Sequence, residues 1–329
     1  MNTSTSTPIA DPPQLGFFER LGVWASWGMG GWIFLTAGWM IMRPADPLGP
    51  VSLFSGQSGL LVVALVAALS GVTAALATVI AGRKLVDAGT FSVALGLALV
   101  SLRGETAGYF VLQSIDPAHA PKFWQLPLES LGWLLVIGVA ICVSDVVMRW
   151  CHPKAVRELA DPSTDRVPAV PAGFELRAFG SGAAARTPLR IALTHTVVVA
   201  VAGLIAFTVL SAGLATRAIE HGQACFVVAA SVCVACYVAY RIAPVRSALW
   251  SILGVGLLTI GAYLWVTLTG SAGSNPPGVP ASPFLRVLPL QYISVGTAAA
   301  VAMTWYAHDP YRTPARSTQM SYGASHGAS

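Results

Sequence analysis

Charge is scarce in this sequence of 329 residues, and its scarcity argues against a soluble fold. Asp, Glu, Lys and Arg make up 10% of the chain, against roughly 25% in a typical soluble domain, whereas hydrophobic residues make up 55%. A soluble protein of this size cannot cover its surface with 19 basic and 14 acidic side chains. A surface that faces lipid needs no such cover. The composition therefore predicts a membrane protein whose partner is the lipid bilayer.

The sequence also lacks the signs of several functions. Its basic residues are scattered or lie in one loop, without interleaved aromatics, so we expect no nucleic-acid partner. Five cysteines, an odd number, make no disulfide framework, and no second ligand type accompanies the stripe of Cys225, Cys233 and Cys236, so we expect no metal site. The G-x-x-x-x-G-K-[ST], H-E-x-x-H and G-x-S-x-G motifs are absent. A haem held by two histidines would need a second histidine at the depth of His195, and His152 and His308 lie at the ends of their segments instead. We therefore expect no cofactor.

Long apolar runs are what the sequence has instead. Eight of them approach the roughly 20 residues that a bilayer requires, and each is expected to be a helix, because lipid cannot satisfy a bare backbone. They lie at residues 21–42, 59–80, 86–103, 130–149, 190–212, 223–241, 248–269 and 288–307. The predicted fold class is all-α, a polytopic membrane protein of about eight transmembrane helices.

Lys and Arg are distributed unequally between the two sides of these segments. With the N-terminus and every second loop on one side, that side holds 14 basic residues and the other holds 5. Cytoplasmic loops carry the excess, which predicts that both termini and the long 150–189 loop are cytoplasmic. Arg and Ala are abundant, as in a GC-rich bacterial genome, so we expect a bacterial inner membrane protein.

The segments divide the chain into five regions. Residues 1–20 and 308–329 are expected to be disordered cytoplasmic tails. Residues 21–149 and 190–307 are expected to be membrane halves of four helices each. Between them, residues 150–189 are rich in Pro and Ala and hold too little apolar material for a core, so we interpret them as a cytoplasmic linker.

A short similarity suggests that the halves are repeats. "PKFWQLPL" at 121–128 and "PFLRVLPL" at 283–290 share P-x4-L-P-L at an offset of 162 residues. At the same offset, "IAGRK" at 80–84 matches "IAPVR" at 242–246 in its first two residues and its basic end. Such edge patterns also arise without duplication. Because each half has four helices, true repeats would be parallel rather than inverted.

Arg103 and Glu105, in "SLRGETAGYF", are the first candidate polar site. Counted from Leu85, Arg103 is about 27 Å along its helix, which places it at the outer rim of the membrane. Residues two apart on a helix cannot face each other, and no counter-ion lies one turn from Arg103. We expect Arg103 to be held by a carboxylate or carbonyl of another segment. A rim anchor and a ligand site both fit these residues.

Five residues near the inner face form the second candidate. Asp87, Asp145, Arg149, Arg190 and His195 fall at similar depths, and Asp145 and Arg149 have the spacing of a helix ion pair. They are the only titratable residues of the sequence that suggest a shared vestibule. Interface pairing of Asp145 with Arg149 and packing of His195 explain these residues more simply than catalysis does, so the sequence assigns no catalytic residue.

Three classes of function remain. A transporter or channel for a small solute usually has ionisable or helix-breaking residues near mid-membrane, and the span centres here are apolar or small. An intramembrane enzyme requires convergent titratable groups, for which the inner-face residues are the candidates. The first expectation is therefore a non-catalytic scaffold, assembly factor or subunit that contacts other membrane proteins. Glycines such as those of "GMGGW" are expected to allow close helix packing.

Overall fold

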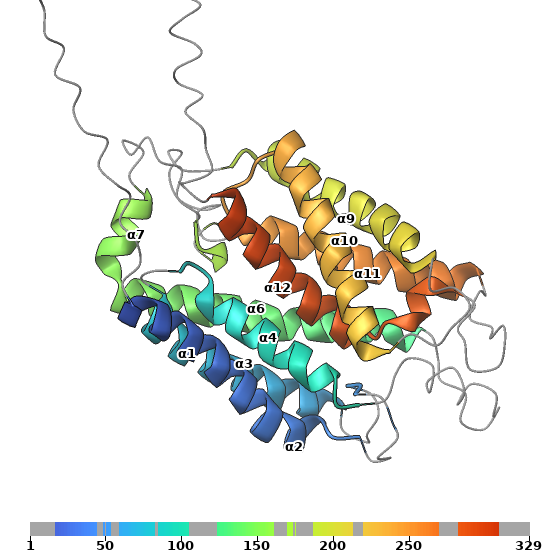
Figure 1. The fold of residues 1–329 in the computed structure, drawn as a ribbon, viewed down its shortest axis with the longest axis horizontal. Helices are drawn as coiled ribbons and strands as arrows, with labels where there is room; N and C mark the ends of the chain where they lie inside the picture. The colour runs from blue at the N-terminus through green and yellow to red at the C-terminus, as the bar shows by residue number, and fades with distance from the viewer. Residues whose placement is uncertain are drawn as a thin grey trace, which may run out of the picture.

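A computed structural model shows an all-helical architecture throughout the part of the chain that it describes (Figure 1). The structure describes residues 17–44, 49, 51–53, 59–82, 85–104, 124–160, 170–173, 175, 187–212, 220–269 and 282–308. Five helices are long and apolar enough to cross a membrane, and these are α3, α6, α9, α10 and α11. This finding supports the predicted class of helical membrane protein.

The helices begin and end close to the predicted limits. The first half holds α1 (Phe17–Ile33), the π-helical turn η1 (Phe34–Gly38), α2 (Trp39–Met42), α3 (Gly59–Ala81), α4 (Ala88–Ser101) and α6 (Gln125–Cys151). The second half holds α9 (Leu189–Ala212), α10 (His221–Ile242), α11 (Ala248–Thr269), the 3-10 turn η2 (Pro283–Arg286) and α12 (Pro289–Ala307). Pro127 and Pro289 lie in the first turns of α6 and α12, where a missing N–H breaks no helical hydrogen bond.

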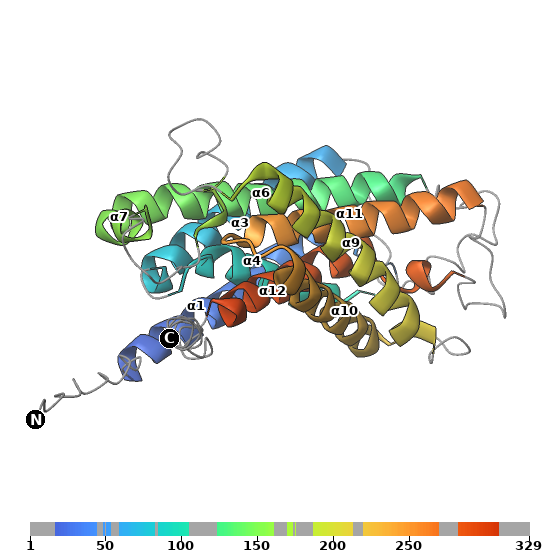
Figure 2. The same ribbon diagram turned by 90° about the horizontal axis from the view of Figure 1, so that it is seen from above.

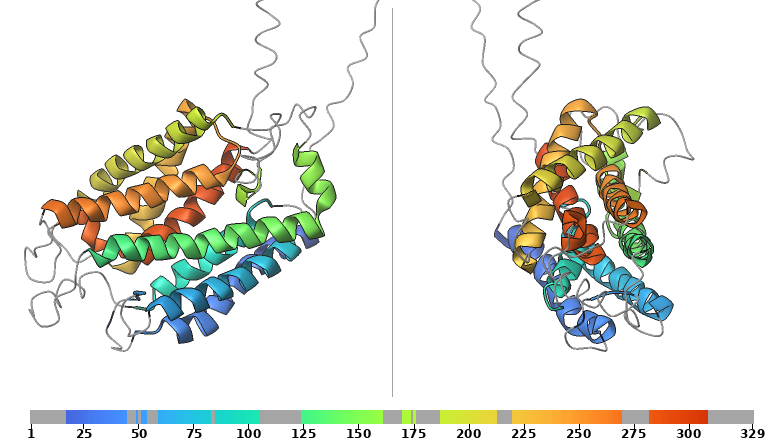
Figure 3. Two further views of the ribbon diagram at one scale, coloured as in Figure 1. Left: turned by 180° about the vertical axis from the view of Figure 1, so that it is seen from behind. Right: turned by 90° about the vertical axis from the view of Figure 1, so that its right-hand side faces the viewer.

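The helices run roughly along one common direction, with α1 to α6 on one side and α9 to α12 on the other (Figures 1 and 3). Across the junction α4 packs against α12, and α6 packs against both α11 and α12. We name the two ends of the bundle after residues of α6. The Glu129 end is where α6 begins, and the Asp145 end is where it finishes.

The core is filled by large side chains from both halves. Phe34, Trp133, Phe207, Tyr263 and Tyr292 are all less than 2% exposed. Tyr292 packs against Tyr263 with ring centroids 5.8 Å apart and against Phe207 at 5.2 Å. Apolar side chains are exposed instead along the outward faces of α1, α3 and α9, among them Trp32, Leu61, Val72, Val197, Ile205 and Val209. This distribution suits a bundle surrounded by lipid.

The region expected as a linker contains structure that the sequence analysis did not anticipate. Helix α7 (Pro153–Ala160) follows α6 and turns across its end (Figures 1 and 2). Val170, Pro171, Ala172, Gly173 and Glu175, which we call the 170–175 segment, are buried against the Asp145 end. The Val170 N–H donates to the Arg246 carbonyl at 2.9 Å. This segment therefore packs on both halves of the bundle.

Candidate functional site

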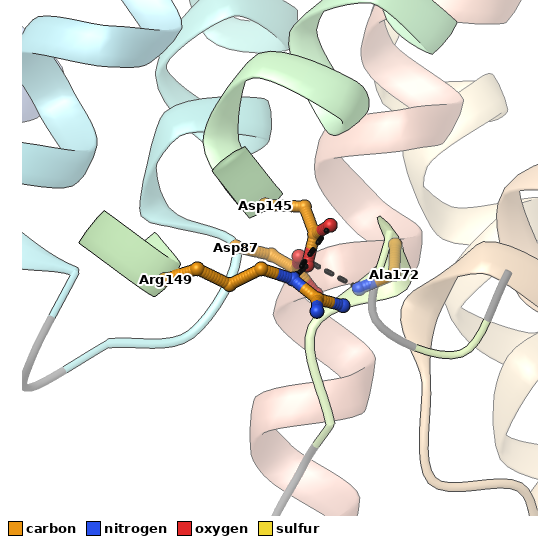
Figure 4. Close-up of polar contacts among 4 residues, drawn as sticks. All are labelled: Asp87, Asp145, Arg149 and Ala172. Atoms are coloured by element: carbon orange, nitrogen blue, oxygen red, sulfur yellow. Dashed lines mark hydrogen bonds and ion pairs between the residues drawn. The ribbon is translucent and has the colours of Figure 1, made fainter. Parts of the chain in front are cut away.

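Asp87 occupies an unusual backbone conformation at the Asp145 end. It precedes α4 with φ 62° and ψ 18°, in the left-handed region, and it makes no side-chain cap to the helix. An Asp at this position usually has an extended backbone and accepts from the first helical N–H groups. Here Asp87 Oδ1 instead accepts the Ala172 N–H at 3.2 Å (Figure 4). The strained conformation thus turns the carboxyl group toward the 170–175 segment.

Asp145 and Arg149 form the ion pair that their spacing predicts. Arg149 Nε lies 3.2 Å from both Asp145 carboxylate oxygens, and Asp145 is only 3% exposed (Figure 4). Gly173 lies directly on Asp145, since a Cβ at Gly173 would come within 2.9 Å of the carboxyl carbon. The 170–175 segment therefore covers Asp145 as well as Asp87.

Glu175, which is not among the residues predicted from the sequence, brings a third carboxyl group to this site. Its side chain is 6% exposed, and its Oε2 has no hydrogen-bond partner among the described residues. We call Asp87, Asp145 and Glu175 the acidic cluster. Burial, followed by the charges of Asp145 and Glu175, raises the pKa of Asp87 from 3.8 to about 7, although the Ala172 N–H acts in the opposite direction. Asp87 can therefore exchange a proton near neutral pH.

Two of the predicted inner-face residues do not join this group. Arg190 is exposed near the start of α9. His195 is fully buried, where Nδ1 lies 2.8 Å from the Ala243 carbonyl and Nε2 lies 2.9 Å from Ser251 Oγ. Both ring nitrogens thus have partners, which ties α9 to the end of α10 and the start of α11. The five predicted residues therefore separate into the Asp87, Asp145 and Arg149 group and two isolated positions.

Aromatic side chains lie beside the acidic cluster. Trp27 of α1 and Trp305 of α12 stack with ring centroids 6.2 Å apart, and Phe91 of α4 contacts both. The Trp305 Nε1–H donates to the carbonyl of Val86 at 2.7 Å. These contacts hold the backbone immediately before Asp87 and place Trp27 of α1 beside the end of α12.

A second polar site, at the Glu129 end, is centred on a residue that the sequence analysis did not select. Glu129 is 2% exposed and accepts three hydrogen bonds. Ser52 Oγ donates at 2.7 Å, the Leu53 N–H at 3.2 Å and Trp133 Nε1 at 3.1 Å. Trp133 is one turn along α6, whereas Ser52 and Leu53 belong to the segment before α3. Glu129 therefore holds that segment against the bundle.

Arg103 also lies at the Glu129 end, and a carbonyl of another segment holds it, as expected. Its Nη1 donates to the Leu35 carbonyl at 2.9 Å, and its guanidinium lies 5.5 Å from the centre of the Trp39 ring. The partner is the carbonyl of a helical residue rather than a carboxylate. Leu35 belongs to the π-helical turn η1, where the usual i to i+4 pattern of backbone bonds is interrupted. Glu105 lies outside the described residues.

Replacement of Arg103 tests whether this contact stabilises the fold. We expect Arg103→Ala to lower the free energy of unfolding by about 1 kcal/mol, because the charged hydrogen bond and the ring contact are lost at an exposed position. Arg103→Lys should be intermediate. Melting temperatures in detergent measure the effect, with Arg43→Ala as the control for loss of an exposed positive charge. Equal melting temperatures for all Arg103 variants would show that the contact does not stabilise the protein.

Metal chemistry receives no support from these groups. Within the described residues, no set of three or more His, Cys, Asp and Glu side chains is arranged to hold a metal ion. The arrangement at the Asp145 end is suited to binding and releasing protons, whereas Glu129 accepts backbone and side-chain donors. No protein family, curated protein or solved structure matches the chain in sequence or fold comparison.

Proposed function

We propose that the protein is a non-catalytic component of the bacterial inner membrane: a scaffold, assembly factor or subunit that contacts other membrane proteins. The observation that carries this proposal is the use of two carboxyl groups, of which Asp87 is partly buried and Glu129 is buried. Asp87 and Glu129 each accept an N–H from a segment far away in the sequence, and each thereby holds that segment against the bundle. Between them, aromatic side chains from both halves fill the core.

The proposal includes eight transmembrane helices. Besides the five long helices, the continuous run of α1, η1 and α2 extends over residues 17–42, and α12 and the shorter α4 lie at the junction of the halves. The ring stacking of Trp27 and Trp305 supports an even number of crossings, because it places the first part of the continuous 17–42 run beside the end of α12. With the 14-to-5 distribution of basic residues, the Asp145 end is cytoplasmic.

Packing supports two parallel halves related by a twofold axis. In the first half, α1 and α6 each pack on α3 and α4; in the second half, α9 and α12 each pack on α10 and α11. If α1, α3, α4 and α6 are matched in order with α9, α10, α11 and α12, the α4–α12 contact corresponds to the α11–α6 contact. Under the same matching, the α6–α12 contact corresponds to itself. A twofold axis beside α6 and α12, along the membrane normal, has this property.

One pair of side chains supports the same register. Glu129 and Gln291 each follow the "LPL" sequence at the 162-residue offset. Glu129 holds Ser52 and Leu53, just before α3, and Gln291 Nε2 lies 3.0 Å from Nδ1 of His221, the first residue of α10. Each matched residue thus contacts a residue at or before the start of the second long helix of its own half, although the contacted residues are not themselves 162 positions apart.

Quantitative co-purification tests the proposed role. The full chain, carrying an affinity tag, is extracted in a mild detergent and in native lipid nanodiscs, and its partners are identified by mass spectrometry. We expect one membrane protein at a constant molar ratio through two successive, different columns. A tagged, unrelated membrane protein of similar size controls for adventitious capture. Recovery of the chain alone under both conditions would contradict the proposal.

The acidic cluster favours a second candidate function, a transporter for a small solute. The third candidate is an intramembrane enzyme with a cytoplasmic-face site. Proton-coupled transport uses carboxyl groups that titrate near neutral pH, as Asp87 does. Proteoliposomes with an imposed pH gradient test this candidate by proton flux measured with an entrapped dye. The scaffold proposal predicts flux equal to that of empty vesicles, and flux abolished by Asp87→Asn would favour the transporter.

A further inference from the structure

The 170–175 segment rests on the acidic cluster through two hydrogen bonds and one close contact. Ala172 donates to Asp87, Val170 donates to the Arg246 carbonyl, and Gly173 lies on Asp145. Glu175, at the end of the segment, is buried with an oxygen that has no hydrogen-bond partner among the described residues. The segment therefore brings a buried carboxyl group, one of whose oxygens has no such partner, near Asp87.

The charges around Asp87 favour a neutral form of this group. Asp145, although it is paired with Arg149, and Glu175 both lie near enough to Asp87 for their negative charges to raise its pKa. Two other titratable groups lie near this end. Tyr240 of α10 interacts electrostatically with Asp87, and His308 interacts electrostatically with Arg246. With Asp87 and Glu175 both ionised, closure of the segment places like charges together in a region of low dielectric constant.

We propose that the acidic cluster binds a proton, held at Asp87, which keeps the 170–175 segment closed over the ends of α4 and α6. Loss of the proton leaves Asp87 and Glu175 both negative, and the segment detaches. The closed arrangement is compatible with a neutral carboxyl group, because its carbonyl oxygen still accepts the Ala172 N–H. The left-handed backbone of Asp87 directs the group to this position instead of to the start of α4. The proposal is independent of which partner the protein binds.

The direction of the pH dependence follows from the raised pKa of Asp87. The closed form binds the proton more tightly than the open form, whose pKa has the ordinary value of 3.8. The proton on Asp87 therefore stabilises the closed segment fully below about pH 4, and this stabilisation is lost as the pH rises through about 7. Between pH 5.5 and 8.5, linkage predicts that the ratio of closed to open segment falls roughly 30-fold.

Hydrogen–deuterium exchange of the full-length protein in nanodiscs measures this ratio. The readout is the protection factor of the Val170 and Ala172 amides, which divides out the intrinsic pH dependence of exchange. In the wild type we expect a roughly 30-fold fall from pH 5.5 to 8.5. Asp87→Asn keeps an acceptor and the left-handed backbone but carries no charge, so its protection should stay high and change less than about 3-fold. Constant protection in the wild type would overturn the proposal.

Two further variants keep the test decisive. Glu175→Gln removes one like charge, so the fall in protection should move to lower pH. Glu129→Gln removes a buried carboxyl group at the opposite end and should leave the profile of Val170 and Ala172 unchanged. A wild-type pH profile in both Asp87→Asn and Glu175→Gln would assign the pH dependence to other groups and overturn the proposal. Unchanged helicity and elution volume establish that each variant is folded.

Discussion

Gly30→Ala is expected to lower the free energy of unfolding by about 2–3 kcal/mol, whereas Gly28→Ala, half a turn away, should leave it unchanged or slightly higher. A Cβ at Gly30 would lie 2.5 Å from the Ser92 carbonyl oxygen, where α1 crosses α4. The added methyl group must separate the two helices, which also breaks the 2.7 Å bond from Ser92 Oγ to the Ser26 carbonyl. A Cβ at Gly28 meets nothing within 4 Å.

The second half contains a matching experiment. Position 254 is 162 residues after Ser92, and a Cβ at Gly254 would lie 2.6 Å from the Val199 Cβ and 2.9 Å from the Thr196 carbonyl oxygen. Gly254→Ala should therefore be similarly destabilising, with Gly261→Ala as its control. Thermal melts in detergent report all four variants. Gly28→Ala as damaging as Gly30→Ala would mean that helix flexibility, rather than the crossing, determines stability.

Glu129→Ala is the second substitution with a large expected effect, a loss of about 3 kcal/mol. The change leaves the buried donors of Leu53 and Trp133 without an acceptor and releases the Ser52 hydroxyl. Glu129→Gln should cost less than about 1 kcal/mol, because its amide oxygen still accepts both N–H groups and its NH2 can donate to Ser52. The two variants differ in acceptor capacity, while both remove the charge.

Denaturation in mixed micelles measures these differences, with the wild type as the reference. If Glu129→Gln is as destabilising as Glu129→Ala, the charge rather than the acceptor is what the site requires. If neither variant is destabilised, Glu129 does not hold residues 51–53 in place.

The limits of the helices were predictable from the sequence, because apolar runs and flanking charges are local signals. The segment expected at 59–80 is α3 at Gly59–Ala81, and the one expected at 248–269 is α11 at Ala248–Thr269. The interpretation of the glycines in "GMGGW" as packing residues holds for Gly30 but not for Gly28. Composition alone does not distinguish them, since the difference is the face of α1 on which each glycine lies.

The polar sites were less predictable because their partners are remote. Asp87 bonds Ala172, 85 residues away, and Glu129 bonds Leu53, 76 residues away, and no local spacing links such pairs. Only the Asp145–Arg149 pair, one turn apart on α6, could be inferred from the sequence. Glu175 lay in a segment whose Pro-rich composition suggested a linker. A single buried carboxyl group in such a segment gives no signal until the fold places it beside two others.

The arrangement of eight spans, on which the assignment of both faces rests, is tested most directly by reporter fusions. A reporter that is active only outside the cytoplasm is fused after Leu53, after residue 160 and after Ser329, with matched expression levels. The account predicts activity after Leu53 and none at the other two positions. Activity after residue 160 or at the C-terminus would place the Asp145 end outside the cytoplasm and contradict the account.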